Sequence, residues 1–139
     1  MSTLQRNGSQ AFVDGGAVNF TGRARFAPLF KCAGPAPVSG AVVTFEPGAR
    51  SNWHTHPCGQ TLIVTDGLGW TQCEGEAKVE IRPGDVITCP RDKRHWHGAS
   101  PHSPMTHIAI AEADARGIVV DWMEPVTDAQ YHSPLDTSR

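Results

Sequence analysis

Side chains able to bind a metal ion are concentrated in two short stretches of this sequence. Residues 53–60 read WHTHPCGQ, and residues 95–97 read HWH. Successive side chains of a β-strand point to opposite faces, so the two histidines of each stretch share one face when the stretch is extended. Imidazole nitrogens together with an amide oxygen suit a divalent first-row transition metal. The spacing therefore predicts one metal site built from His54, His56, Gln60, His95 and His97.

Gln60 sets the expected chemistry of this site. We expect its carbonyl oxygen to reach the metal through pairing of the strand that begins at Gln60 with the strand that carries His54 and His56. A glutamate at this position would cancel half of a divalent ion's charge, whereas a neutral glutamine cancels none of it. Redox-neutral chemistry is therefore favoured over oxygen activation, and the site should attract anions.

Histidines outside these stretches need separate treatment, because a lone histidine is usually only hydrogen-bonded. His102 and His132 lie in Ser/Pro-rich segments, where we expect no metal. His107 shares a strand face with Met105, Ala109 and Ala111, so its ring should project among small residues into a cavity. On the residues alone, His107 is either a catalytic acid or base or a hydrogen-bonded cavity residue. His97 is a fifth ligand, an acid or base, or a group that orients another imidazole.

Composition points to a small-molecule partner. The 139 residues contain 12 Lys and Arg and 14 Asp and Glu, a net charge of −2, with no long block of either sign. This argues against binding to nucleic acid or to a membrane. We expect a soluble, cytoplasmic protein, because the first residues lack the layout of a secretion signal. Without CxxC pairs, we expect reduced and mostly buried thiols at Cys32, Cys58, Cys73 and Cys89.

The segments that must position these residues alternate apolar and polar side chains between turn residues, a pattern typical of antiparallel sheet. Turn chemistry recurs at Asp66-Gly67, at residues 83–85 and at residues 90–93. An all-β barrel or double-sheet sandwich is therefore expected. The predicted strands are residues 20–26, 38–46, 52–56, 60–65, 70–74, 77–82, 86–89, 95–99 and 105–111.

Three regions are expected along the chain. Residues 1–18 are a polar, Gly-rich arm that either pairs with another subunit or is loose. Residues 19–125 form the barrel, and residues 126–139 form a tail. The tail contains Thr127 three residues before Gln130, the spacing of a capping box, and this predicts a short C-terminal helical turn.

A cavity wall is also expected on the inner face of the sheet. The candidate substrate-pocket residues of this wall are Phe20, Ala41, Val43 and Trp122, and Ala41 shares a strand face with Val43. For each of them, core packing is favoured over substrate selection. Trp53 and Trp96 alternate with the histidines and should point away from the metal, in structural positions.

The spacing of these residues resembles the cupin superfamily. Gly48 begins a motif of the form G-x5-HTH-x3-Q-x6-G that ends at Gly67, and Gly84 begins one of the form G-x5-P-x4-H that ends at His95. Both spacings match the two motifs of that superfamily. The sequence departs from them at Gln60, which replaces the usual glutamate, at Asp92, which replaces glycine, and at Ala99, which replaces asparagine.

A narrower resemblance extends along nearly the whole chain, to the small bacterial manganese-dependent cupins with hydroxynitrile lyase activity. The matching segments are FTGRARFAPLF, VTFEPGARSNWHTHPCGQTLIVTDGLGW, IRPGDV, KRHWHGA, MTHIAI and VDWMEPVTDAQY. The resemblance implies a single-domain cupin β-barrel, or jelly roll, that assembles into homodimers or homotetramers. It also implies Mn²⁺, with Fe²⁺, Zn²⁺ and Ni²⁺ as alternatives, held by His54, His56, Gln60 and His95. By the same resemblance, His97 and His107 lie beside the ion.

Three functional hypotheses follow. The first is a metal-dependent lyase that cleaves or forms cyanohydrins such as mandelonitrile, with His97 or His107 moving the proton. The second is an iron-dependent dioxygenase. The third is another redox-neutral cupin, such as an isomerase or decarboxylase, or a non-catalytic binder of a small molecule. Because one fold hosts many activities, the resemblance identifies the site more closely than the substrate.

Overall fold

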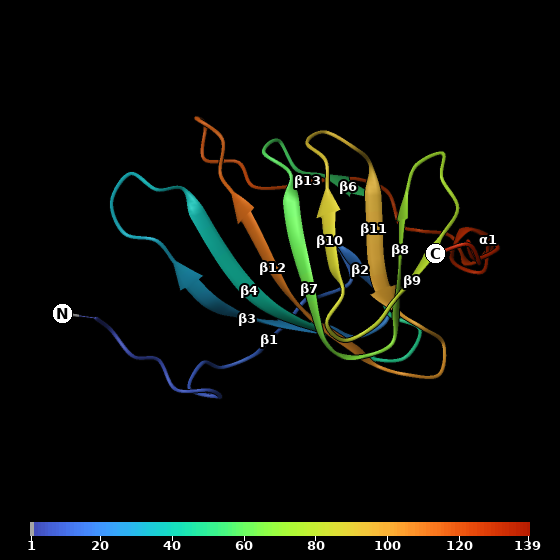
Figure 1. Cartoon of the computed structure of the whole chain (residues 1–139), viewed down its shortest axis with the longest axis horizontal. Helices are drawn as coiled ribbons and strands as arrows, with labels where there is room; N and C mark the ends of the chain where they lie inside the picture. The colour runs from blue at the N-terminus through green and yellow to red at the C-terminus, as the bar shows by residue number, and fades with distance from the viewer. Residues whose placement is uncertain (1) are drawn as a thin grey trace.

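The computed structural model describes residues 2–139 and is built almost entirely from antiparallel strands (Figure 1). Two curled sheets face each other. In spatial order, the first sheet contains β1 (Val13–Asp14), β3 (Ala24–Lys31), β4 (Val38–Phe45), β12 (Met105–Glu112), β7 (Gln60–Gly67) and β10 (Val86–Cys89). The second contains β13 (Asp121–Trp122), β6 (His54–Thr55), β11 (His95–Ala99), β5 (Arg50–Ser51) and β2 (Phe20–Thr21), with β8 (Gly69–Cys73) beside β11 and β9 (Val79–Ile81) beside β8. The all-β prediction is confirmed.

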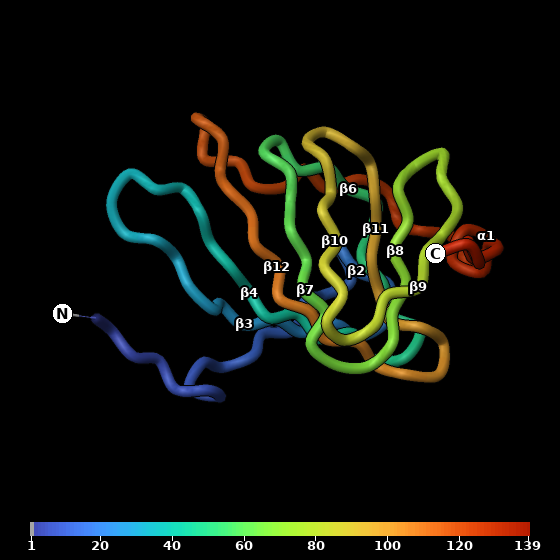
Figure 2. Tube along the Cα trace, in the orientation of Figure 1, coloured from blue at the N-terminus to red at the C-terminus, as the bar shows by residue number. Residues whose placement is uncertain are grey.

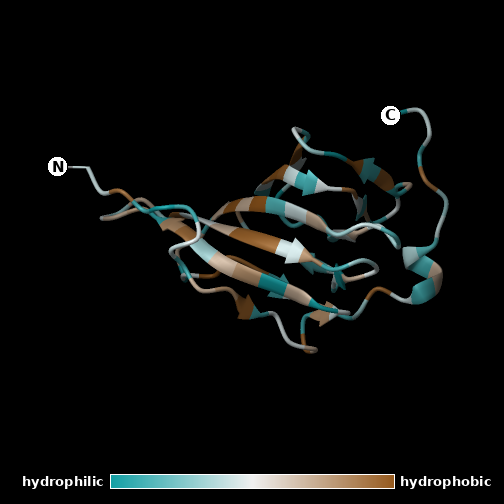
Figure 3. Cartoon of the chain, turned by 90° about the horizontal axis from the view of Figure 1, so that it is seen from below, coloured by the Kyte–Doolittle hydropathy of each residue, from teal (hydrophilic) through white to brown (hydrophobic). Residues whose placement is uncertain are grey.

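The main core lies between the two sheets. Alternation along the strands, visible as colour bands in Figure 3, turns one apolar row of each strand inward. Phe45 of β4, Val64 of β7 and Met105 of β12 are almost completely buried there. The other members of this core cluster are Ala24, Ala49, Ile81 and Ala99. The core fills one end of the barrel and leaves the other end free for a cavity.

All nine predicted strand segments contain strand, and two of them, 20–26 and 52–56, are wrong about where the chain is continuous strand. The predicted strand 20–26 is interrupted at Gly22, which has φ +77° and no room for a side chain against Ala49. The chain changes sheets at this point, so β2 and β3 are separate strands and β3 extends to Lys31. The predicted strand 52–56 contains only β6, because the preceding strand β5 ends at Ser51 and residues 52–53 are irregular. The two-residue strands β1 and β13 are too short to give a periodic signal.

The predicted turns also act differently from hairpin turns. The chain leaves β7 in the first sheet and enters β8 in the second sheet on either side of Leu68. The turns at residues 83–85 and 90–93 likewise carry the chain from one sheet to the other. This repeated crossing produces a jelly roll, in which consecutive strands face each other across the barrel.

The C-terminal tail packs on the outer face of the second sheet. The predicted helix is present as α1 (Asp128–Tyr131), and Thr127 and Gln130 form both hydrogen bonds of the capping box. Tyr131 is buried with Trp53, Trp96 and Val126 in a second core cluster. Its hydroxyl donates to Ala99 O at 2.5 Å. Trp53 and Trp96 thus have the structural positions expected of them.

The thiols are free, but their predicted burial is wrong for two of the four. Cys89 is buried and Cys73 is half-buried, whereas Cys32 and Cys58 are exposed. Cys32 follows the last residue of β3, and Cys58 lies in the turn between β6 and β7, so neither has a packed sheet face. The part of the arm within residues 2–18 is irregular apart from β1, which pairs with β3. No helix among residues 2–139 is long and apolar enough to cross a membrane.

Gly67 tests how the crossing turn is built. It has φ +80°, and a Cβ at this position would lie 1.9 Å from Pro104 O. Gly67→Ala should therefore lower the free energy of unfolding by about 3 kcal/mol, because backbone strain adds to a clash with main chain. Gly75→Ala is the matched control, since Gly75 has φ +82° and nothing within 4 Å. Its expected cost is about 1 kcal/mol. Urea unfolding measures the free energy of unfolding of both variants. An equal fall in the two variants would show that the contact of Gly67 with Pro104 does not determine the turn.

Candidate metal centre

The two histidine stretches lie side by side in the second sheet. β6 pairs with β11, and His95 is directly opposite His54. Their ring centroids are 4.3 Å apart. His54 is also 5.0 Å from His56 and 5.2 Å from His97, measured between ring centroids. Register between neighbouring strands therefore brings four imidazoles, from segments forty residues apart in the sequence, into one group.

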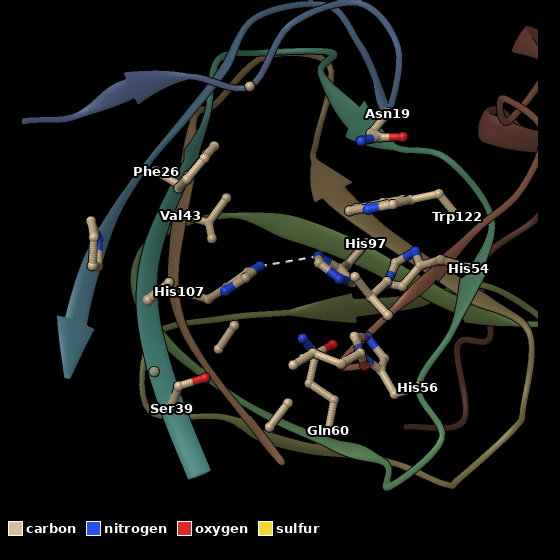
Figure 4. A pocket seen from close by; sticks show the side chains of 18 of the residues that line it. Asn19, Phe26, Ser39, Val43, His54, His56, Gln60, His97, His107 and Trp122 are labelled. Atoms are coloured by element: carbon tan, nitrogen blue, oxygen red, sulfur yellow. Dashed lines mark hydrogen bonds between the residues drawn. The ribbon is translucent and has the colours of Figure 1, made fainter. Parts of the chain in front are cut away.

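Gln60 reaches this group by a route different from the one expected. Its strand, β7, belongs to the first sheet and pairs with β10 and β12, not with β6. The turn between them is tight, with Gly59 N donating to His56 O at 3.1 Å and Gly59 at φ +76°. Gln60 is therefore the first residue of β7, a strand of the facing sheet, and its side chain lies next to His56 (Figure 4). The predicted pairing was wrong, but the predicted proximity is present.

The orientation of three imidazoles is fixed from behind by the main chain. Each has its Nδ1 within hydrogen-bonding distance of a carbonyl oxygen, which can only accept. These contacts join His54 to Asn52 O at 2.8 Å, His56 to Val119 O at 2.9 Å and His95 to Lys93 O at 3.2 Å. The proton of each neutral ring must therefore reside on Nδ1, which leaves the lone pair on Nε2. This arrangement is usual behind metal-bound histidines.

The atoms facing the centre of the group have no protein partner. His56 Nε2, His95 Nε2 and Gln60 Oε1 are buried and accept no hydrogen bond from residues 2–139. Buried polar atoms are nearly always paired, so several orphaned acceptors close together need a common partner. A cation satisfies them all, and the residues therefore fit a metal ion. Ring nitrogens of His54, His95 and His97 also lie within 4.8 Å of one another, close enough to share one ion.

Burial keeps these histidines neutral. Desolvation is the largest cause of the lowered pKa of all four histidines, His54, His56, His95 and His97. Repulsion between neighbouring imidazoles lowers the pKa of His54, His95 and His97 further. Only the neutral ring offers a lone pair to a metal, so the barrel holds its histidines in the form that binds a cation.

His107 is joined to the histidine group through His97. His107 Nε2 and His97 Nδ1 are 3.0 Å apart, drawn as the dashed line in Figure 4, so one of these nitrogens donates to the other. The remaining ring nitrogens, His97 Nε2 and His107 Nδ1, are buried without a partner. Because the shared proton sits on one ring or the other, one remaining nitrogen bears a proton and the other a lone pair whenever both rings are neutral. The pair thus contains both a proton donor and a proton acceptor.

A cavity of about 630 Å³ opens onto these side chains. All four residues expected in its wall line it, namely Phe20, Ala41, Val43 and Trp122. Trp122 packs on His54 with ring centroids 4.8 Å apart and contacts Phe20 at 5.6 Å. Most of the remaining wall is apolar or small. His102 and His132 are not among the residues that line the cavity.

Several lining residues were missed by sequence reasoning. Phe26 shares the inward face of β3 with Ala24, so parity alone identifies it. Val119 and Val120 belong to an irregular segment that gives no periodic signal, although Val119 O holds His56 in place. The other missed residues are Asp14, Gly15, Asn19, Pro28, Lys31, Ser39 and Gly40.

Comparison with known proteins agrees with this geometry. Residues 41–111 match the family model described as "Cupin domain". The chain is 59% identical over 128 residues to the (R)-mandelonitrile lyase of Granulicella tundricola, and the match covers 92% of this chain and 97% of that protein. It is 34% identical to a cupin-like protein from Thermotoga maritima, whose crystal structure matches with a TM-score of 0.79 over 94% of this chain and 95% of the other.

A more distant neighbour shares the fold alone. It is the crystal structure of a predicted oxalate decarboxylase from Thermotoga maritima, with 18% identity and a TM-score of 0.71 over 78% of this chain and 96% of the other. The family match spans just over half of the sequence, and the relative from Granulicella matches along almost all of it. This chain therefore belongs to the cupin family.

Proposed function

We propose that the protein is a metal-dependent hydroxynitrile lyase that cleaves cyanohydrins such as mandelonitrile into an aldehyde and hydrogen cyanide, and also forms them. The proposal rests mainly on one observation: neutral side chains that can bind a metal lie next to the His97–His107 pair in a largely apolar cavity. The 59% identity to a mandelonitrile lyase supports the same reaction.

The proposed ligands are His54, His56, Gln60 and His95, and the proposed ion is manganese. When bound, a divalent ion supplies Lewis acidity, which lowers the pKa of a hydroxyl or water and stabilises negative charge on oxygen. Since none of these side chains carries a negative charge, they leave that positive charge uncompensated. The cavity then attracts an anion such as cyanide, which is the leaving group of the proposed cleavage.

The His97–His107 pair handles the protons. Two nitrogens of the pair, His97 Nε2 and His107 Nδ1, lie outside the shared hydrogen bond, and one of them is unprotonated. In cleavage, the cyanohydrin hydroxyl gives its proton to that unprotonated nitrogen, and the carbonyl forms as the carbon–carbon bond breaks. The electrons of that bond leave with cyanide. Because the two rings share a hydrogen bond, the pair can return a proton to cyanide from the nitrogen at its other end. The products are a neutral aldehyde and hydrogen cyanide, and the pair has lost and gained one proton.

The apolar wall holds the rest of the substrate. Phe26, Val43 and Trp122 border the space next to the histidines (Figure 4), and an aryl group placed there displaces water from the reacting atoms. Fewer waters at the site strengthen every electrostatic interaction within it. We further propose, from the resemblance, that the protein forms a homodimer or homotetramer. The proposed location is the cytoplasm.

The direct test is benzaldehyde release from mandelonitrile by protein purified with Mn²⁺. We expect activity that chelation abolishes and added Mn²⁺ restores. The His54, His95 and His97 group also suits an iron-dependent dioxygenase, because three histidines can hold Fe²⁺. Oxygen uptake by the Fe²⁺ form with a small aromatic substrate, without cyanohydrin cleavage by the Mn²⁺ form, would replace the lyase by that alternative.

Removing the proton-handling group should stop turnover without emptying the site. His107→Ala and the bulkier His107→Gln should each lower kcat for mandelonitrile by a factor of about 10² to 10⁴, because a positioned acid or base contributes that much. Metal content, measured by elemental analysis, should stay at the wild-type level. His102→Ala, in an exposed loop, is the control and should retain full activity. Full activity in both His107 variants would contradict the mechanism.

Changing the charge of the fourth proposed ligand should separate metal binding from catalysis. Gln60→Glu keeps an oxygen donor of the same length but cancels one positive charge, so it should retain metal and lose about tenfold or more in kcat. Gln60→Ala should lose metal affinity. Elemental analysis and mandelonitrile kinetics measure the two effects. A Gln60→Glu variant as active as wild type would show that the neutral ligand is irrelevant to the reaction.

A further inference from the structure

The end of the cavity farthest from the histidines contains a lysine that simple strand alternation would place outside the barrel. Pairing of β3 with β4 is irregular near Leu29, which forms a β-bulge. Pro28 lies opposite Ala41, Phe30 opposite Gly40 and Lys31 opposite Ser39. Directly paired residues share a face, so the extra residue reverses the alternation and places Lys31 on the inner face of β3, where its side chain is exposed to solvent and lines the cavity.

Packing on the outer face fixes this register. The ring of Phe30 covers Gly40 so closely that a Cβ on Gly40 would lie 2.3 Å from the ring. A slip by one residue would put a side chain in the place of Gly40 and would force the ring of Phe30 to move, so this register is favoured. Lys31 and Ser39 consequently both line the cavity. The loop that joins β3 to β4 projects from the barrel in Figure 2.

The space between this lysine and the metal centre is lined by small side chains. Strand register forms one row of side chains across β7, β12, β4 and β3, which contains in order Gln60, Ala111, Ser39 and Lys31. With neighbouring strands about 4.8 Å apart, the Cα atoms at the two ends of the row are separated by about 14 Å. Between them lies the methyl group of Ala111, and Ala41 and Ala109 lie nearby on the same inner face. A molecule can therefore extend from the histidines to the lysine.

The positive charge of Lys31 is uncompensated. Within residues 2–139 it forms no ion pair. One acidic residue, Asp14, lines the same cavity, and it lies opposite Arg25 in the pairing of β1 with β3. Arg25 is six residues before Lys31, so Asp14 and Lys31 are separated by about 20 Å along the strand. A cation at the mouth of a largely apolar cleft attracts and orients anions.

We propose that Lys31, assisted by Ser39, binds an anionic group at the end of the substrate remote from the reacting carbon. The preferred substrate class is then a cyanohydrin, or its parent aldehyde, with a carboxylate on an apolar body. This inference rests on the proposed lyase function and narrows its substrate. Mandelonitrile fills the apolar part of the cavity but leaves the lysine without a partner.

Matched substrates test the proposal. We expect wild-type kcat/KM to be higher for the cyanohydrin of 4-formylbenzoate than for mandelonitrile. In Lys31→Met the ratio of the two kcat/KM values should fall about tenfold, the effect of one charge-assisted hydrogen bond at a partly solvated site. Lys31→Arg should preserve most of the ratio, and Lys31→Glu should reduce it further. Arg23→Met removes a charge from an exposed residue outside the cavity and should leave the ratio unchanged.

Binding provides a second, independent readout. Calorimetric titration with 4-formylbenzoate should show tighter binding than titration with benzaldehyde, and Lys31→Met should remove this difference. If the wild type fails to cleave mandelonitrile, the lyase function falls while the calorimetry still tests the anion site. Equal affinity for both aldehydes, or an equal fall of the ratio in Arg23→Met, would overturn the proposal.

Discussion

Three hydrogen bonds from imidazole to main chain determine what this protein can do. Main-chain carbonyls accept from Nδ1 of His54, His56 and His95, and this forces the three lone pairs onto the opposite side of each ring. Without these bonds the rings could turn or change tautomer, and the inner face of the barrel would carry polar groups of no fixed character. With these hydrogen bonds in place, the buried acceptor atoms face a common space in which no donor of residues 2–139 reaches them. A buried arrangement of this kind is costly unless a cation occupies it, so binding of a metal ion there would stabilise the fold.

The rest of the barrel keeps those carbonyls in place. Asn52 and Lys93 each lie two residues before the histidine that they hold, so the strand starts themselves supply two of the three acceptors. On the opposite face of the same strands, Trp53 and Trp96 alternate with the histidines and pack under the C-terminal tail. The alternation that sends imidazoles inward thus also anchors the sheet from outside. A tail without catalytic residues therefore contributes to the geometry of the site.

Local patterns predicted the parts of the site that depend on one strand at a time. Parity placed His54 with His56, turned Trp96 away from His95, and gave the inward row that includes His107; the capping box of the tail was equally local. Features that depend on two strands were not accessible. Gln60 comes from the facing sheet because the chain crosses the barrel at residues 57–59, and Lys31 faces inward because a bulge reverses the alternation at Leu29. Val119 holds His56 from a segment with no regular pattern, and only the folded chain brings the two together.

We expect neutral side chains from both sheets to bind one cation together. A crystal structure of the protein purified with Mn²⁺, with anomalous data collected near the manganese edge, tests this most directly. We expect a single strong anomalous peak within bonding distance of Nε2 of His54, His56 and His95 and of the Gln60 side-chain oxygen, with each histidine Nδ1 still hydrogen-bonded to its carbonyl oxygen. A peak elsewhere, or density showing Gln60 turned away from a site filled by water, would contradict it.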